Sequence, residues 1–206
     1  MTSAAQNESL HPQAGQTMSG SEIIVQVLAD EGVDVVFGYS GGAILPTYDA
    51  IFRHNQQPAN EQGAGFMAAG YARASGKVGV AVVTSGPGAT NCVTPVRDCM
   101  ADSIPIVLIC GQVPTGAIGS DAFQEAPISN IMGGCAKHVF LVTDPARLEA
   151  TVRTAFEIAR SGRPGPVVID VPKDIQNYSG SFQGAGLLPI PGYRKRLATV
   201  EKRKLA

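Results

Sequence analysis

Short apolar runs alternate along this chain with longer stretches in which apolar residues recur at helical spacing. The apolar runs do not alternate with polar residues, and such strands are tolerated only where both faces of a sheet are covered. The pattern therefore predicts an α/β fold, a doubly wound and mostly parallel sheet with helices on both faces. The predicted strands are 33–37, 78–84, 104–110, 138–142 and 167–171.

Several predicted helices are marked by the residues at their ends. Ser19 and Glu22 have the spacing of a capping box, and the helix that they begin is expected to end at Gly32. The final helix has Asp144 as its predicted cap and Pro145 at its first helical position. Further helices are expected at 43–52, 61–75 and 89–101, the last with a kink at Pro95.

The ends of the chain differ in composition from its middle. Residues 1–18 are polar, without an apolar period, and are predicted to be a disordered leader. Residues 19–176 are predicted to form one domain. Residues 177–206 contain Gly, Pro and Ser and then become basic, which is typical of a linker, here toward a middle domain that we expect to be absent.

Composition excludes several classes of partner. The chain has 206 residues, 16% charged, with a formal net charge of −1, so it shows no electrostatic footprint for nucleic acid or an anionic membrane. Its longest apolar runs are too short to span a bilayer. The four cysteines lack CxxC spacing and do not cluster with histidines, so we expect no metal site and reduced, buried thiols in a cytoplasmic protein.

Glycine-rich turns follow the predicted strands. In parallel sheets ligands bind at the carboxyl ends of the strands, where the turns 38–42, 84–88 and 111–114 should converge. Each turn alone is a weak signal. The turn at 84–88 lacks the Gly-Lys-Ser/Thr ending of a P-loop, and the turn at 38–42 does not continue as GxGxxG, so nucleotide binding is disfavoured.

The helix predicted at 61–75 contains Gly63, Gly65 and Gly70, each of which costs up to about 1 kcal/mol relative to alanine. Close approach of a flat ligand or a partner helix explains them as well as tight packing on the sheet does. Glu61 lies in the first turn, where the helix dipole favours a carboxylate. Taken alone, this glutamate is better explained as a helix-end residue than as a functional one.

An ordered set of motifs changes this interpretation. The motifs are Glu61 to Ala64, Gly70 to Ala74, Thr84 to Asn91, Asp102 to Pro105, Gly111 to Pro114, Asp121 to Glu125, Lys137-His138 and Gly162 to Val167. Over residues 19–175 they resemble the N-terminal, pyrimidine-binding domain of the acetolactate synthase (acetohydroxyacid synthase) large subunit. The motifs at 61–64 and 84–91 indicate thiamine diphosphate enzymes in general, and those at 111–125 and 137–138 narrow the resemblance to the synthases.

The resemblance implies roles for individual residues. In such enzymes a glutamate hydrogen-bonds the ring nitrogen of the cofactor's aminopyrimidine and promotes its imino tautomer, and Glu61 has that position by motif. Gln112 is implied as a second catalytic residue, near the reacting carbon. The remaining implied positions are Pro87 and Asn91 beside the pyrimidine, Gly41 and Gly42 near the reacting carbon, and Phe123 and Lys137 at the substrate channel.

The chain also departs from the family pattern. An apolar strand usually precedes the glutamate, but residues 51–60 are short, polar and contain proline, so one strand of the sheet is predicted to be missing. Asn60 stands where a histidine is usual. The resemblance further implies a middle domain that holds FAD and a C-terminal domain that binds the diphosphate through Mg²⁺, and we expect this chain to lack both.

The activity implied for the full enzyme condenses two pyruvates, or pyruvate and 2-oxobutyrate, with loss of CO₂, in branched-chain amino acid biosynthesis. The implied partners are a 2-oxo acid substrate, a second copy or intact large subunit in a homo-oligomer, and a regulatory small subunit. Because the family's site forms between two subunits, we expect the isolated chain to be inactive. The alternatives are the pyrimidine subunit of a split decarboxylase or carboligase, and a non-catalytic fragment that pairs with intact subunits.

Overall fold

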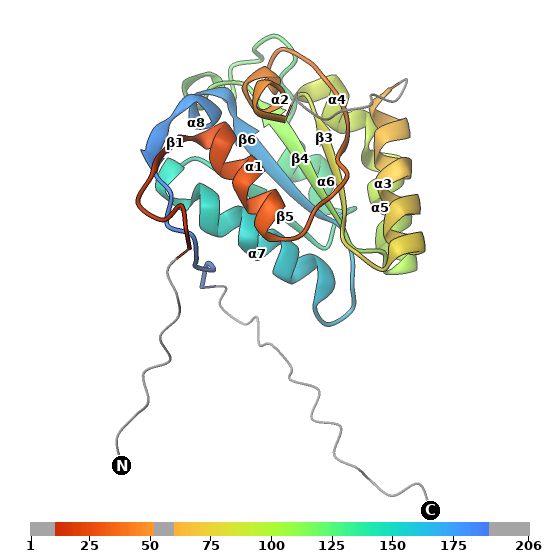
Figure 1. Ribbon diagram of the computed structural model, residues 1–206. Helices are drawn as coiled ribbons and strands as arrows, with labels where there is room; N and C mark the ends of the chain where they lie inside the picture. The colour runs from red at the N-terminus through yellow and green to blue at the C-terminus, as the bar shows by residue number, and fades with distance from the viewer. Residues whose placement is uncertain (1–10, 52–59, 190–206) are drawn as a thin grey trace, which may run out of the picture.

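A five-stranded parallel sheet forms the middle layer of the computed structural model, which describes residues 11–51 and 60–189 (Figure 1). All neighbouring strands in it run parallel. The predicted α/β class is confirmed; the strand predicted to be missing falls mainly on residues outside the described ones. In spatial order the strands are β2 (Phe37–Tyr39), β3 (Gly79–Val83), β4 (Ile106–Gln112), β6 (Val167–Pro172) and β5 (His138–Leu141).

Two layers of helices cover the sheet (Figure 1). One face packs on α1 (Gly20–Asp30), α2 (Leu45–Ile51), α7 (Leu148–Arg160) and α8 (Lys173–Asn177). The other packs on α3 (Glu61–Ser75), α4 (Gly86–Asn91), α5 (Val93–Asp102) and α6 (Ile128–Gly133).

The central strands bury both of their faces. Every residue of β3, β4 and β6 is buried. In β3, Val80 and Val82 face the α1 and α7 side, whereas Ala81 and Val83 face the α3 and α5 side. Burial of a valine stabilises the fold by about 1.5–3 kcal/mol, so both faces favour apolar residues. This two-sided burial explains why the apolar runs of the sequence do not alternate.

Several predicted elements have different limits in the structure, among them the strand expected at 104–110, which is β4 at 106–112, and the final helix, which begins at Leu148 after a turn at Pro145–Arg147. Two further differences have a clear physical reason. The strand expected at 33–37 is β2, Phe37–Tyr39, because Val33 N–H donates to the Leu28 carbonyl at 3.0 Å and closes the end of α1. The single helix expected at 89–101 is instead α4 and α5, separated at Cys92. Pro95 lies in the first turn of α5 and lacks the N–H that would bond to the Asn91 carbonyl, so the hydrogen-bond ladder does not continue from α4 into α5.

The segments that flank the predicted domain fold against it. Strand β1 (Thr17–Ser19) pairs antiparallel with β7 (Ser179–Ser181), and the side chain of Phe182 is fully buried. The predicted limits of 19 and 176 stay predictions, but ordered contacts extend beyond both. Of the predicted leader, residues 1–10 lie outside the described part of the chain.

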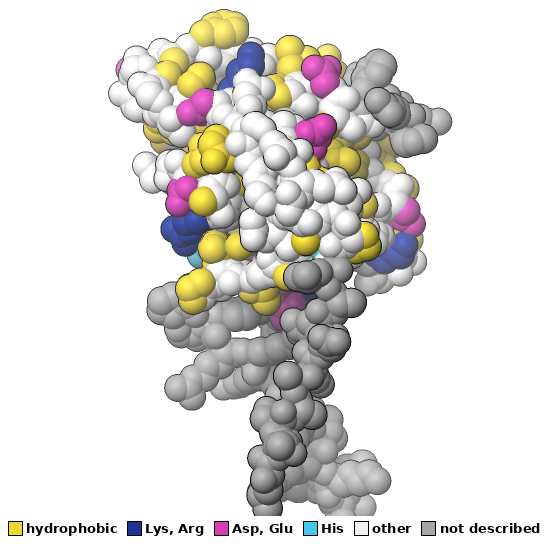
Figure 2. All heavy atoms as spheres, turned by 60° about the vertical axis from the view of Figure 1, so that its left-hand side comes forward, with side chains coloured by type: hydrophobic (Ala, Val, Ile, Leu, Met, Phe, Trp, Pro, Cys, Tyr) yellow, Lys and Arg dark blue, Asp and Glu magenta, His cyan; other side chains and the backbone are white. Residues whose placement is uncertain are grey.

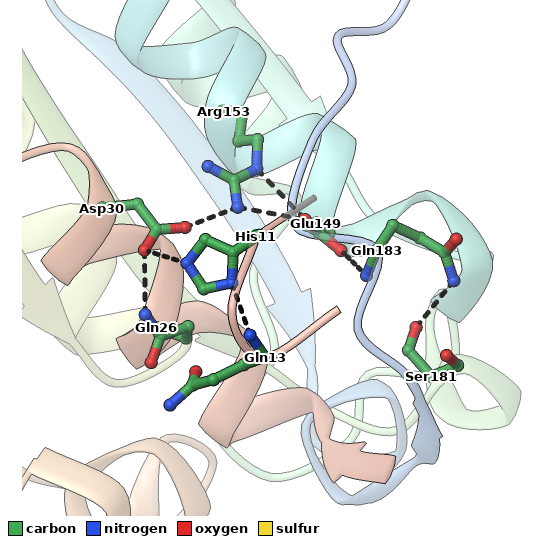
Figure 3. A network of polar contacts seen from close by, with 8 residues as sticks. All are labelled: His11, Gln13, Gln26, Asp30, Glu149, Arg153, Ser181 and Gln183. Carbon is green, nitrogen blue, oxygen red and sulfur yellow. Dashed lines mark hydrogen bonds and ion pairs between the residues drawn. The ribbon is translucent and has the colours of Figure 1, made fainter. Parts of the chain in front are cut away.

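A network of charged side chains joins these two segments to α1 and α7 (Figure 3). Arg153 donates to Asp30 at 2.6 Å and to Glu149 at 3.1 Å. His11 approaches the second oxygen of Asp30 at 3.1 Å, and the Gln183 N–H donates to the second oxygen of Glu149 at 2.7 Å. We call His11, Asp30, Glu149, Arg153 and Gln183 the chain-end cluster.

The surface carries charges of both signs. On the face shown in Figure 2, Lys and Arg side chains lie scattered among Asp and Glu side chains, with apolar side chains between them. Among the helices in the described residues, none is long and apolar enough to cross a membrane.

Candidate functional site

The glycine turns meet at the carboxyl ends of the strands, at one rim of the sheet. A Cβ added to Gly41 would lie 2.6 Å from Thr84 Oγ1, so the first and second turns are in contact. A Cβ added to Gly111 would lie 2.8 Å from the Ala43 carbonyl, so β4 adjoins the first turn as well. Neither glycine can accept a side chain without displacing its neighbour. The structure therefore brings together the turns that the sequence predicts to converge.

Glu61 is placed on this rim by the start of α3. Asn60 has an extended backbone and its side chain accepts a hydrogen bond from Gly63 N–H at 2.7 Å, which caps the helix. The Glu61 carboxylate then accepts a hydrogen bond from Asn91 Nδ2 at 3.0 Å, and the Cys92 thiol donates to the Glu61 carbonyl at 3.2 Å. Asn60, the residue that departs from the family pattern, thus keeps Glu61 in the first turn.

Helix α4 lies beside this carboxylate and carries two of the predicted cofactor residues. Pro87 occupies the first turn of α4 and is exposed, and Asn91 is exposed at the helix end. Between them, a Cβ on Gly88 would lie 2.7 Å from Thr84 Cγ2 and 3.3 Å from Glu61 Oε1. Because residue 88 has no side chain, none lies between α4 and the second carboxylate oxygen.

Two hydroxyl groups in the turn that leads into α4 are buried without a hydrogen-bond partner among the described residues. Thr84 is 4% exposed and Ser85 is 1% exposed, yet neither Thr84 Oγ1 nor Ser85 Oγ is bonded. Ser85 precedes α4 at the position where a serine normally caps a helix, but its side chain makes no such bond. A buried unpaired hydroxyl costs about 1–3 kcal/mol. We call Glu61, Thr84, Ser85 and Asn91 the rim cluster.

The rim cluster fits a flat, nitrogen-containing ring of the aminopyrimidine kind. It offers a carboxylate that can accept or share a proton and hydroxyls that can donate or accept, and the adjoining Gly42 is open, because a Cβ added there would meet nothing within 4 Å. Burial, and secondarily the Glu61 charge, raises the pKa of Tyr48 above its usual value and that of Cys92 to about 12. These two neighbours therefore stay protonated at neutral pH.

Gln112 lies at the end of β4 but does not reach the rim cluster. It is 2% exposed; its Nε2 donates to Asp170 Oδ2 at 2.9 Å and to the Ala126 carbonyl at 3.3 Å, and its Oε1 accepts from Val113 N–H at 2.8 Å. All the polar atoms of this amide are engaged within the protein. Its implied catalytic role stays a prediction.

The two residues implied at the substrate channel lie at opposite ends of the strands. Phe123 is 88% exposed on the loop after β4, and a Cβ on Gly86 would overlap the Gln124 carbonyl, so this loop reaches the rim. Lys137 instead precedes β5, and its Nζ donates to the Ser161 carbonyl at 2.6 Å and to the Ile158 carbonyl, beside the end of α7. A residue just before a parallel strand lies at the amino end of the sheet, so Lys137 is not part of the rim.

Several residues at or near the rim were given no role from the sequence. The hydroxyls of Thr84 and Ser85 belong to a quoted motif, but only the structure reveals that they are buried and unpaired. Asp170 is 1% exposed within an apolar strand, and a lone carboxylate in such a strand is a signal that could have been used. Gln176 is fully buried and donates to the Ala43 carbonyl at 2.8 Å, which supports the first turn; its sequence context has no comparable signal.

The structure contains no group of three or more His, Cys, Asp or Glu side chains able to hold a metal ion within residues 11–51 and 60–189. The polar groups at the rim are a carboxylate, hydroxyls and an amide, which suit an organic ring.

Sequence comparison identifies the protein family to which this chain is similar. The family model described as "Thiamine pyrophosphate enzyme, N-terminal TPP binding domain" matches residues 18–132. The acetolactate synthase catalytic subunit, mitochondrial, of Saccharomyces cerevisiae is 56% identical over 164 residues, covering 77% of this chain and 24% of the relative. The acetolactate synthase large subunit of Corynebacterium glutamicum is 46% identical over 185 residues, covering 88% and 30%.

A third relative, the acetolactate synthase isozyme 2 large subunit of Escherichia coli, is 49% identical over 169 residues. That alignment covers 81% of this chain and 31% of the relative. The chain thus spans about a quarter to a third of the length of these relatives.

Proposed function

We propose a function for this chain on the basis of its family. The chain belongs to the thiamine pyrophosphate enzymes and is an N-terminal TPP binding domain of acetolactate synthase type. Its function is to bind the aminopyrimidine half of thiamine diphosphate at the rim cluster. The observation that carries the proposal is that Thr84, which flanks Gly88 together with the Glu61 carboxylate, and the adjacent Ser85 have buried hydroxyls with no partner among the described residues.

In this proposal Glu61 is the residue that handles a proton. Asn91 holds one carboxylate oxygen, and the other, on the side of Gly88, is left to accept or share a proton with a ring nitrogen. Pro87 and Asn91 on one side and Gly41 and Gly42 on the other orient the ring. Thiamine diphosphate, when bound, supplies the electron sink for chemistry on 2-oxo acids, and the protein supplies orientation and polarity.

The activity of a whole enzyme is a further proposal, because the chain spans 24–31% of the relatives quoted above. It is the condensation of two 2-oxo acids to an acetohydroxyacid with loss of CO₂, by an assembly that includes a second large subunit and a regulatory subunit. FAD and Mg²⁺ would be bound by parts of that assembly outside the described residues. The cytoplasm is the proposed location, although the yeast relative is named as mitochondrial.

A titration followed by NMR tests the binding proposal. Thiamine diphosphate, with Mg²⁺, is added to the ¹⁵N-labelled chain, and we expect amide shifts at Glu61 to Gly63 and at Thr84 to Asn91. Glu61→Gln should weaken them, because an amide cannot share a proton as a carboxylate does. Shifts confined to other regions, or equal for both proteins, would refute the proposed site.

The proposed inactivity of the chain alone has its own test. Purified chain is incubated with pyruvate, thiamine diphosphate, Mg²⁺ and FAD, and acetolactate is measured. We expect none, since the rim cluster provides no group for a diphosphate–metal unit. Acetolactate formation without another chain would overturn this expectation.

A second candidate function is pairing with an intact large subunit or, in a split enzyme, with a separate diphosphate-binding chain. Helix α3 favours it, because Phe66 and Met67 are 41% and 48% exposed on the same helix as the exposed Gly70. A pulldown with intact large subunits tests pairing, with Met67→Lys as the variant expected to lose it. A monodisperse monomer that binds neither kind of chain would exclude this function.

A further inference from the structure

The loop of residues 113–127, which we call the rim loop, joins β4 to α6 and carries Phe123. It is held near both ends. Near its start, Asp174 accepts hydrogen bonds from Thr115 N–H at 3.0 Å and from the Thr115 hydroxyl at 2.5 Å. Near its end, the Ala126 carbonyl accepts from Gln112 Nε2 at 3.3 Å. Asp174 follows β6 and Gln112 ends β4, so the sheet itself holds the loop at both points.

We propose that Asp170 is a positioning residue that holds the rim loop through the Gln112 amide. The Nε2 group that donates to Ala126 also donates to Asp170 Oδ2 at 2.9 Å. The amide cannot turn over, because its Oε1 accepts from Val113 N–H at 2.8 Å. The carboxyl group thus sets which end of the amide faces the loop, and the loop is anchored by that end.

The closed rim loop keeps the Asp170 carboxyl group away from water. Asp170 and Gln112 line a cavity of about 220 Å³ whose wall includes Gly119, Ala126 and Pro127 of the rim loop. The second oxygen, Asp170 Oδ1, is buried and has no partner within the part of the chain that the structure describes. Displacing the rim loop would therefore open the cavity and let water reach this carboxyl group.

Burial raises the pKa of Asp170 from 3.8 to about 7, although the hydrogen bond from Gln112 opposes the shift. Cys110 on the neighbouring strand has a thiol pKa raised well above its usual value by burial, and stays neutral. Glu125, on the same cavity, has a pKa lowered chiefly by the Gly119 N–H, and stays ionised. Helix α6 carries no charged residue. Asp170 is thus the group of this cavity that titrates near neutral pH.

The sign of the pH effect follows from linkage. With the rim loop closed, the pKa of Asp170 is high because the charged form is desolvated. With the loop displaced, water solvates the charge and the pKa falls toward its ordinary value. A rise in pH through about 7 therefore favours displacement of the rim loop, and neutral Asp170 favours the closed position.

Hydrogen exchange of the full chain between pH 5.5 and 8.5 tests this proposal, with rates corrected for intrinsic exchange. We expect protection of peptides covering 118–127 to fall about tenfold as pH rises, while β3 and β4 stay protected. Asp170→Asn, which keeps an acceptor for Gln112 but cannot ionise, should abolish the pH step. Gln112→Met, which removes the bonds to Asp170 and Ala126, should speed exchange of the rim loop at every pH.

Asp174→Asn is the matched control. It loosens the start of the same loop, but the pKa of Asp174 is already lowered, by hydrogen bonds from Thr115 against the effect of burial, so the pH step should persist. A pH step that survives in Asp170→Asn overturns the proposal, as does normal exchange in Gln112→Met. If Gln112→Met does not fold, the Asp170→Asn profile alone decides.

The proposal depends on the proposed function only where it connects the loop to substrate, through Phe123. The exchange experiment uses no ligand. A failure of thiamine diphosphate to bind would leave its outcome unchanged, and an absent pH step would leave the binding site at Glu61 untouched.

Discussion

The chain-end cluster and the rim cluster are both groups of polar side chains held by several elements, but they differ in how their hydrogen bonds are satisfied. In the chain-end cluster, Arg153 lies between Asp30 and Glu149, and each carboxylate has a further partner (Figure 3). In the rim cluster, the Thr84 and Ser85 hydroxyls are buried without a described partner. A satisfied network stabilises the fold, whereas an unsatisfied one leaves polar groups free to bond a ligand or water.

The largest expected effect on the free energy of unfolding is in the chain-end cluster. Arg153→Ala leaves the buried Glu149 carboxylate without its cation and also removes the partner of Asp30, and breaking a buried pair costs about 3–5 kcal/mol. Although burial opposes it, the Arg153 hydrogen bond lowers the pKa of Asp30, so this charge depends on the arginine. Urea unfolding measures the loss. Arg160→Ala, at a half-exposed ion pair, should lose under about 1 kcal/mol and serves as the control.

The next effect concerns Asp170, whose Oδ1, like the rim hydroxyls, is buried without a partner in the described part of the chain, although its Oδ2 accepts from Gln112. Its pKa is raised to about 7, so the folded state holds a proton that the unfolded state has released above about pH 4. Asp170 therefore lowers stability as pH rises from about 4 to 7, by up to about 4 kcal/mol. Urea unfolding across this range should show a smaller decline for Asp170→Asn. Parallel curves for both proteins would contradict this expectation.

Glu61→Gln should separate binding from stability at the rim. We expect thiamine diphosphate to bind at least tenfold more weakly, which is about 1.4 kcal/mol, because proton sharing with the ring is lost. The free energy of unfolding should change by less than about 0.5 kcal/mol, since glutamine can still accept from Asn91. Calorimetric titration and urea unfolding measure the two quantities. A large loss of stability with unchanged affinity would make Glu61 a structural residue.

The smallest expected effect has the opposite sign for stability. Thr84→Val replaces a buried, unpaired hydroxyl with a methyl group of similar size, so the protein should be as stable as before or up to about 1 kcal/mol more stable. Ligand affinity should fall, because a polar contact to the ring is lost. The same two measurements apply. Destabilisation without loss of affinity would show that the hydroxyl is not reserved for a ligand.

Much of the fold could be predicted from local patterns. The capping box at Ser19 is present at the start of α1. Asp144, expected to cap the final helix itself, caps the turn at Pro145–Arg147 that precedes α7. The limits of β2 and the break between α4 and α5 were missed. The N–H of Val33 is used to close α1, and the missing N–H of Pro95 interrupts the hydrogen-bond ladder between α4 and α5.

The residues of the candidate site could be predicted only in part. Glu61, Pro87 and Asn91 come from motifs on neighbouring helices, and the structure brings them together. The direction of a strand decides on which edge of the sheet a residue lies. Lys137 precedes β5 and therefore lies at the edge opposite to the rim, which the motif alone did not indicate. The orientation of the Gln112 amide depends on a partner 58 residues away, for which the sequence offers no periodic signal.

The sequence by itself determined which segments are buried strands, where most helices begin and which family motif carries Glu61, because these depend on local periodicity, helix ends and short-range order. Only the tertiary structure decided which polar groups meet. Asp30 and Arg153 are 123 residues apart and bond to each other, whereas the hydroxyls of Thr84 and Ser85 have no partner among residues 11–51 and 60–189. Whether a buried polar group has a partner depends on every element packed around it, and that is settled only when the chain has folded.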